Sequence, residues 1–361
     1  MKPYLKRLVP LALALLLACV PLLGASAQTD GAQIRITQVD NSKFPQVTLY
    51  VSVTDASGNP LPVDPSQIQV MENGKAMQLE QVSGAGEIGP LTTLLVIDIS
   101  GSMNSSNKIT AAKSAAGAYI DQMRTGDQAG ILSFNTKVNV NQVLTTDHSA
   151  LKQALYTLVP QGNTAMYDAL GQAEQVLQNV SGRKAIIVLT DGIDNASKTN
   201  ADGVIQGIGS GGLSISTIGF GNPDQSSGVS GLDEAALRSL AERAGGVYGY
   251  ANDPGVLTSL YQHLGQTLQS EYKITYTSPL TLRDGQNRTL TVSLAGTATS
   301  QAKYNPGGVL PEVSQGVSWP IFIVTLAALV VLLFLPMIIG RLAPATGKAA
   351  APKKKVNIKL K

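Results

Sequence analysis

The sequence predicts an α/β fold: a doubly wound, mostly parallel sheet inserted in or flanked by a small antiparallel β-sandwich, plus one C-terminal transmembrane helix. Residues 91–270 alternate short apolar runs with helical segments, a pattern typical of a parallel sheet covered by helices. Residues 31–84 and 271–304 alternate apolar and polar positions, as half-buried strands do. Residues 321–340 carry no charge and are long enough to span a bilayer.

The first 27 residues are predicted to be a secretory signal peptide. Lys2, Lys6 and Arg7 form the charged start, an apolar segment follows, and small residues end at Ala27. A lipoprotein signal at Cys19 and an uncleaved N-terminal anchor remain alternatives. Cys19 is the single cysteine, so a disulfide framework and a cysteine-based zinc site are excluded.

Two β segments flank the predicted α/β domain. The N-terminal segment, 28–88, contains an Asn73-Gly74 pair typical of a β-hairpin, and the C-terminal segment is 271–304. We expect the two segments to pair into one β-sandwich with the domain 89–270 inserted between them, since domain termini usually lie close together. Two separate β extensions are the alternative.

Within 89–270 the elements follow one another in a regular order. Apolar runs predict strands at 92–97, 129–134, 138–144, 184–190, 213–219 and 246–250. Helical spacing predicts helices at 109–123, 149–158, 165–180, 233–244 and 254–268. Residues 207–212 are rich in glycine but lack the Lys-Ser/Thr of a phosphate-binding loop, so we interpret them as a plain loop.

The C-terminal part is predicted to anchor the protein. A linker at 305–318 precedes the transmembrane helix 319–340, and the tail 341–361 has seven Lys or Arg residues and no acid. The positive-inside rule places this tail in the cytoplasm and the body outside a single-pass cytoplasmic membrane.

Between residues 28 and 340 there are 17 basic and 24 acidic residues, so nucleic-acid binding is not expected.

Polar side chains follow the first predicted strand of the α/β domain. Asp98, Ser100 and Ser102 come directly after an apolar run, where ligands bind in open α/β sheets. A carboxylate and two hydroxyls offer hard oxygens, which suit Mg²⁺, Mn²⁺ or Ca²⁺. The alternative is that the aspartate is a cap and the serines are ordinary turn residues.

The segment Asp98-Ile-Ser-Gly-Ser102 resembles the metal-ion-dependent adhesion site (MIDAS) of von Willebrand factor A (VWA) domains, here of a bacterial membrane-anchored type. Thr164 in Gln161-Gly-Asn-Thr and Asp191 in Leu189-Thr-Asp-Gly match the remaining positions of the family motif. The resemblance implies a metal site made by five residues: Asp98, Ser100, Ser102, Thr164 and Asp191. It also implies Mg²⁺ (or Mn²⁺ or Ca²⁺) with one open position for an Asp or Glu of a protein partner.

Neighbouring acidic residues are expected to support this site rather than to bind metal. Asp194 is interpreted as a turn or helix-cap residue, and Asp168 as a residue that faces solvent or holds the Thr164 loop.

The two histidines, His148 and His263, lie far in sequence from a suitable serine, and no zinc-protease motif is present. We therefore expect no enzyme, but divalent-cation-dependent protein binding or adhesion. The alternative is an accessory structural subunit of an envelope secretion or pilus assembly complex.

Overall fold

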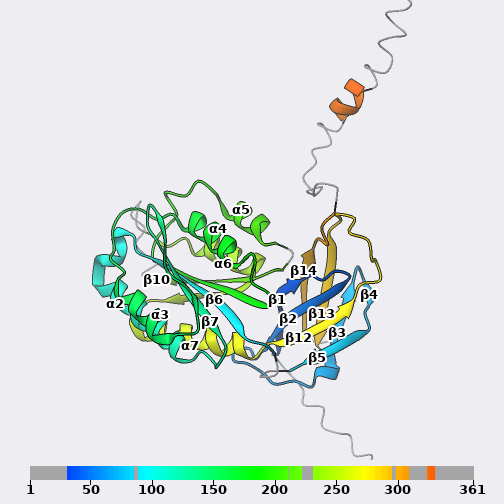
Figure 1. Cartoon of the computed structure of the whole chain (residues 1–361), viewed down its shortest axis with the longest axis horizontal. Coiled ribbons are helices and arrows are strands. Elements are labelled where there is room, and N and C mark those ends of the chain that lie inside the picture. The colour runs from blue at the N-terminus through cyan, green and yellow to red at the C-terminus, as the bar shows by residue number, and fades with distance from the viewer. Residues whose placement is uncertain are drawn as a thin grey trace, which may run out of the picture. The chain divides into compact units, whose positions relative to one another are not determined.

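The computed structural model describes residues 31–84, 88–209, 211–221, 231–294, 298–308 and 323–329. The chain divides into two units, Met1–Val309 and Leu310–Lys361. The first unit contains the α/β domain and the two β sheets that flank it (Figure 1).

A six-stranded sheet forms the centre of the α/β domain. Its strand order is β11 (Gly245–Ala251), β10 (Ser214–Phe220), β9 (Arg183–Thr190), β6 (Leu91–Asp98), β7 (Gln128–Phe134) and β8 (Val138–Thr145). Neighbouring strands are parallel except β7 and β8, which are antiparallel. Every residue of β6 and β9 is buried, as expected for central strands covered on both faces. These two strands end side by side, which brings Asp98 next to Thr190 and Asp191.

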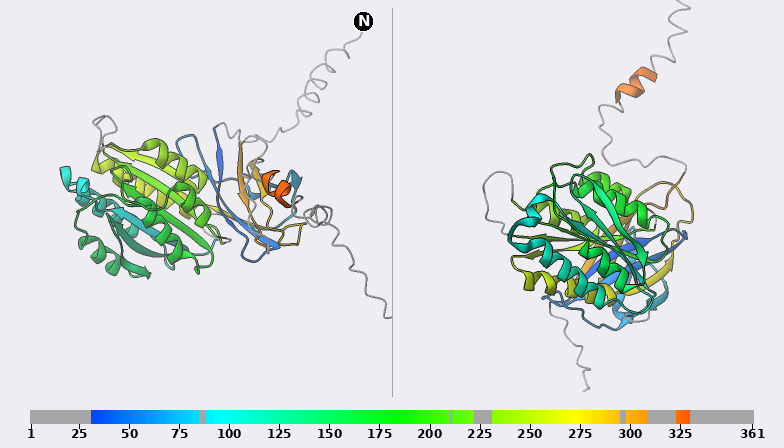
Figure 2. Two further views of the ribbon diagram at one scale, coloured as in Figure 1. Left: turned by 90° about the horizontal axis from the view of Figure 1, so that it is seen from above. Right: turned by 60° about the vertical axis from the view of Figure 1, so that its left-hand side comes forward.

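Helices cover both faces of this sheet (Figures 1 and 2). The helices that pack on one face are α2 (Lys108–Asp121), α3 (His148–Tyr156) and α7 (Pro254–Gln269). Those on the other face are α4 (Met166–Leu177), α5 (Ala201–Gly207) and α6 (Glu234–Arg243). A short 3₁₀ segment, Gly101–Asn107, joins β6 to α2. The α/β class and the mixed, mostly parallel sheet agree with the sequence prediction.

The sequence did not predict α5. This helix has seven residues, two of which are glycines, so its intrinsic helix propensity is low. It forms because the Asn200 side chain caps it by accepting a hydrogen bond from Gly203 N, and because Val204 is buried against the domain core. Capping and burial thus override local propensity here.

The flanking segments form two four-stranded antiparallel sheets. The first has the order β1 (Gln33–Asp40), β2 (Gln46–Thr54), β12 (Tyr272–Thr277) and β5 (Leu79–Ser83). The second has the order β14 (Ala298–Tyr304), β13 (Arg288–Leu294), β3 (Ile68–Glu72) and β4 (Lys75–Ala76). Strands from before and after the α/β domain therefore share both sheets and one apolar core. Asn73 and Gly74, both with positive φ, form the hairpin turn between β3 and β4.

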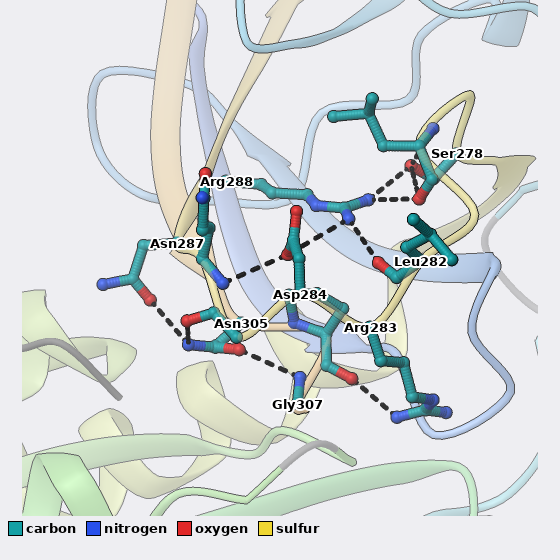
Figure 3. Close-up of polar contacts among 12 residues, drawn as sticks. Ser278, Leu282, Arg283, Asp284, Asn287, Arg288, Asn305 and Gly307 are labelled. Atoms are coloured by element: carbon teal, nitrogen blue, oxygen red, sulfur yellow. Dashed lines mark hydrogen bonds and ion pairs between the residues drawn. The ribbon is translucent and has the colours of Figure 1, made fainter. Parts of the chain in front are cut away.

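A buried arginine organises one end of these sheets (Figure 3). Arg288 is 1% exposed, and its guanidinium donates to Ser278 Oγ at 2.8 Å and to the Leu282 carbonyl at 2.9 Å. It is also ion-paired with Glu72 and Asp284 at 3.4 and 3.5 Å. Because a buried cation needs such partners, Arg288 fixes the connection between β12 and β13 against β3.

Strand β1 joins the flanking sheets to the α/β domain. Arg35 Nη1 donates to the Gly246 carbonyl at 2.8 Å, and Gln38 Nε2 donates to the Gly182 and Gly211 carbonyls, both at 2.8 Å. These three glycines lie at the N-terminal ends of β11, β9 and β10. The β sheets therefore contact the edge of the central sheet opposite to Asp98, so the carboxyl ends of the central strands are left uncovered by the junction.

Several predicted segments lie outside the described residues. They include the signal peptide 1–27, the linker 305–318 from residue 309 onward, and the basic tail 341–361. Of the predicted transmembrane helix 319–340, only 323–329 is described, and it is helical. No helix in the described ranges is long and apolar enough to cross a membrane.

Candidate metal site

The candidate site begins with Asp98, the last residue of β6. This aspartate is fully buried. Its Oδ1 accepts a hydrogen bond from Ser100 N at 2.7 Å, and its Oδ2 accepts one from Thr190 Oγ1 at 2.6 Å. The carboxylate is thus held between the turn that follows β6 and the end of the adjacent strand β9.

Two serine hydroxyls connect Asp98 to the end of β9. Ser100 Oγ lies 3.0 Å from Ser102 Oγ, and Ser102 Oγ donates to Asp191 Oδ1 at 2.6 Å. Ser100 is extended and directly precedes the 3₁₀ segment, and its hydroxyl meets that of Ser102, which in turn reaches Asp191. The Asp191 side chain is fully buried. Residues 89 positions apart in sequence therefore share one polar cluster.

Thr164 reaches the same cluster from the loop before α4. A Cβ placed on Gly192 would lie 3.6 Å from Thr164 Oγ1 and 4.0 Å from Ser102 Oγ, so both hydroxyls flank the turn after Asp191. The loop is tied down by Gly101 N, which donates to the Gly162 carbonyl at 2.9 Å. The structure therefore brings together all five residues that the sequence predicts.

The loop after Asp191 fixes the position of Thr164. Asn195 Oδ1 accepts from Thr164 N at 3.0 Å, and Asn195 N donates back to the Thr164 carbonyl at 3.0 Å. Asp194 caps α4 by accepting from Tyr167 N at 3.1 Å, and Asp168 accepts from Thr199 N at 3.0 Å. Asp194 is thus a helix-cap residue, as the sequence suggests. Asp168 instead holds the segment at Lys198 and Thr199, and not the Thr164 loop that the sequence suggested, because its carboxylate accepts from both of these backbone N–H groups. The role of Asn195 was not predicted, because a lone exposed amide after a strand carries no distinctive signal.

Burial dominates the electrostatics of the site. It raises the pKa of Asp98 to about 6, against the opposing effect of the hydrogen bonds from Thr190 and Ser100. The neighbouring charge of Asp191 raises this pKa further. Asp191 is ion-paired with Lys108, whose Nζ lies 2.7 Å from Oδ2. Sequence reasoning missed Lys108, which is 83 positions from its partner.

The donor set fits a hard divalent cation. Two carboxylates and three hydroxyls supply oxygen ligands of the kind that Mg²⁺, Mn²⁺ and Ca²⁺ prefer. Two buried carboxylates in one cluster also favour a cation, because burial leaves their negative charges poorly screened. The described residues contain no group of three or more His, Cys, Asp or Glu side chains suited to a metal. A cation held at this cluster would need the hydroxyls as ligands as well as the two carboxylates.

Comparison with known families agrees with this geometry. Residues 93–193 match the family model of the von Willebrand factor type A domain. This range includes all five residues of the site. The chain contains a von Willebrand factor type A domain.

The chain has relatives among mycobacterial proteins. A UPF0353 protein from Mycolicibacterium paratuberculosis is 29% identical over 203 residues, which cover 49% of this chain and 60% of that protein. A UPF0353 protein from Mycobacterium marinum is 28% identical over 203 residues, with the same coverage. The chain thus spans about 60% of the length of these curated relatives.

A solved structure that is similar to this chain is a von Willebrand factor type A protein from Catenulispora acidiphila. It is 18% identical, with 76% of this chain and 72% of that chain covered and a TM-score of 0.46.

Proposed function

We propose that the VWA domain is a protein-binding module that takes a divalent cation at Asp98, Ser100, Ser102, Thr164 and Asp191. The observation that supports this is the convergence of two buried carboxylates and three hydroxyls at the carboxyl ends of β6 and β9. The family match over 93–193 gives independent support for an interaction role.

The chain's own residues have distinct tasks in this proposal. Asp98 and Asp191 supply negative charge, and the hydroxyls of Ser100, Ser102 and Thr164 complete an oxygen shell. Thr190 and the backbone of Ser100 keep the Asp98 carboxylate in place. When bound, the cation supplies a positive centre that attracts an Asp or Glu side chain of a protein partner.

The surroundings of the site suit a protein surface. Residues 104–107 and 161–163 are exposed and carry amide, hydroxyl and glycine groups without charge. Ile193, in the turn after Asp191, is 45% exposed and offers one apolar contact. Because this rim is uncharged, it offers no attraction to a highly charged surface and favours a partner that presents a single acidic side chain.

We propose binding rather than catalysis. His148 is the first residue of α3, and His263 Nε2 lies 3.1 Å from the Cβ position of Gly58 in the flanking sheets. His263 is therefore near the junction, at the sheet edge opposite to Asp98. Neither histidine is placed to act as a base for a group bound at the metal site.

Display of the module outside the cytoplasmic membrane is also proposed, and its support is the sequence alone. The segments concerned are the signal 1–27, the span 319–340 and the basic tail 341–361. An accessory role in an envelope assembly would use the same span and tail. Co-purification that survives Asp98→Asn but is lost on deletion of 341–361 would favour that accessory role over metal-dependent binding.

Calorimetric titration of Mg²⁺ and Mn²⁺ into the purified full chain tests the proposal. We expect binding by the wild type and none by Asp98→Asn. Asp121→Asn is the matched control, because Asp121 is an exposed carboxylate paired with Lys152 on the surface. Equal binding by wild type and Asp98→Asn, or no binding by any form, would contradict the proposed site. Partner capture that is lost both with a chelator and in Asp98→Asn would then establish metal-dependent binding.

A further inference from the structure

Lys108 approaches the candidate metal site from the start of α2. It is the first residue of this helix, and its Nζ lies 2.7 Å from Asp191 Oδ2. The Asp191 side chain is fully buried, whereas the Lys108 side chain is 22% exposed. Among the ion pairs of the described residues, this pair is the one that involves a predicted metal ligand.

The local backbone does not favour a lysine at this position. Helix N-termini carry partial positive charge, so a cation in the first turn is unfavourable. The two preceding residues, Ser106 and Asn107, have φ angles of 51° and 56°, a region that non-glycine residues seldom adopt. Asn107 gives the helix no side-chain cap in return. The contact with Asp191 opposes the unfavourable effect of the helix N-terminus on the lysine charge.

The charges of the cluster give Lys108 a definite consequence. Asp98, Asp191 and Lys108 together leave one net negative charge in the absence of metal. A divalent cation changes this to one net positive charge, so a single carboxylate from a partner makes the whole cluster neutral. The same ammonium competes with the metal, because both are attracted to Asp191 and repel each other.

We propose that Lys108 has two opposed effects, weakening divalent-cation binding and strengthening the binding of an acidic side chain to the loaded site. This inference rests on the proposed function and adds to it a residue that sets the selectivity for a carboxylate ligand. The lysine holds Asp191 in the metal-free chain and provides the excess positive charge after metal binds.

The test is calorimetric titration of Mg²⁺ into the full chain as wild type, Lys108→Met and Lys108→Gln. We expect both variants to bind Mg²⁺ about tenfold more tightly, since one nearby positive charge has been removed. Lys152→Met is the matched control: it also removes one lysine charge, but from the exposed pair with Asp121, and is expected to leave the affinity unchanged. Lys108→Gln retains a hydrogen-bond donor toward Asp191, so it serves if the methionine variant does not fold.

A second measurement uses acetate as a probe for the partner's carboxylate. Replacing chloride by acetate at constant ionic strength is expected to tighten Mg²⁺ binding in the wild type and to do so less in the Lys108 variants, by linkage between the two ligands. If the wild type binds Mg²⁺ and both Lys108 variants bind it with equal or weaker affinity, the role of Lys108 is overturned but the proposed function is not. An acetate effect of the same size in the wild type and in the variants has the same consequence. Absence of Mg²⁺ binding in every form overturns the proposed function together with this role. Binding by the variants but not by the wild type supports the inference.

Discussion

Arg183 and Glu271 form a buried ion pair that joins the central sheet to the C-terminal flank. Arg183 Nη2 lies 2.7 Å from Glu271 Oε2, and the side chains are 2% and 4% exposed. Arg183 is the first residue of β9, and Glu271 lies between the end of α7 and the start of β12. Arg183 also donates to the Leu268 carbonyl near the end of α7 and lies over the Tyr50 ring of β2. One guanidinium, at the start of the central strand β9, therefore contacts the flanking sheet that contains β2 and the last helix.

Replacing Glu271 by Gln is expected to lower the free energy of unfolding by about 3–5 kcal/mol, because the change leaves the Arg183 charge buried without a counter-charge. Chemical denaturation of the full chain measures this loss. Glu234→Gln is the control, since its pair with Arg238 spans 4.0 Å on an exposed helix face and should contribute less than about 1 kcal/mol. Similar losses in the two variants would contradict a special role for the buried pair.

Gly246 is expected to tolerate no side chain. A Cβ at this position would overlap the Ile215 carbonyl oxygen of the neighbouring strand β10, and backbone cannot move aside as a flexible side chain can. Gly246→Ala should cost about 3 kcal/mol or more of unfolding free energy.

Gly171, on α4, is the matched control for this substitution. A Cβ there meets no described residue within 4 Å, so Gly171→Ala should stabilise the protein by about 0.5–1 kcal/mol through helix propensity. Thermal unfolding of the two variants checks both signs. A stable Gly246→Ala protein would show that β10 and β11 can separate without loss of the fold.

Glu174 is expected to make stability depend on pH. Burial raises the pKa of this α4 carboxyl from 4.5 to about 7, and its Oε1 has no hydrogen-bond partner among the residues that the structure describes. The folded state therefore holds a proton that the unfolded state releases. Stability from this group is fully present below about pH 4.5 and is lost as the pH rises through about 7.

Glu174→Gln should remove this dependence. Relative to the wild type, the variant should gain about 1–2 kcal/mol of unfolding free energy between pH 4.5 and about pH 8, after allowance for solvent screening. Denaturation at several pH values measures the difference. The same gain in Glu242→Gln, an exposed position on α6, would instead indicate a general effect of net charge.

Asn195 is expected to act on the metal site through Thr164. Its Oδ1 accepts from Thr164 N at 3.0 Å, so Asn195→Ala leaves the five proposed ligands unsubstituted but frees the loop that carries Thr164. Mg²⁺ affinity should fall about 10- to 100-fold, as is typical when a residue that orients a ligand is removed. Titration calorimetry measures this, with Asn163→Ala, an exposed amide in the Thr164 loop, as the control. An unchanged affinity for Asn195→Ala would show that the turn alone positions Thr164.

Much of the fold was predictable because each element had a local signal. The apolar runs that predicted 92–97 and 184–190 correspond to β6 and β9, since a strand buried on both faces has few alternatives to an aliphatic sequence. Capping and turn residues are equally local, as the Asn73-Gly74 hairpin shows. The short helix α5 was missed because its formation depends on burial of Val204, which its own seven residues do not reveal.

The sequence by itself determined the α/β class and the five residues that resemble a VWA metal site, since strand composition and motif spacing are properties of short segments. Only the tertiary structure decided how those segments meet. It placed Lys108 on Asp191, Asn195 on Thr164, and Arg183 on Glu271, pairs that are 83, 31 and 88 positions apart. Such contacts depend on sheet order and on the packing of α2 and α7, because residues this far apart in sequence become neighbours only when the fold brings their segments together.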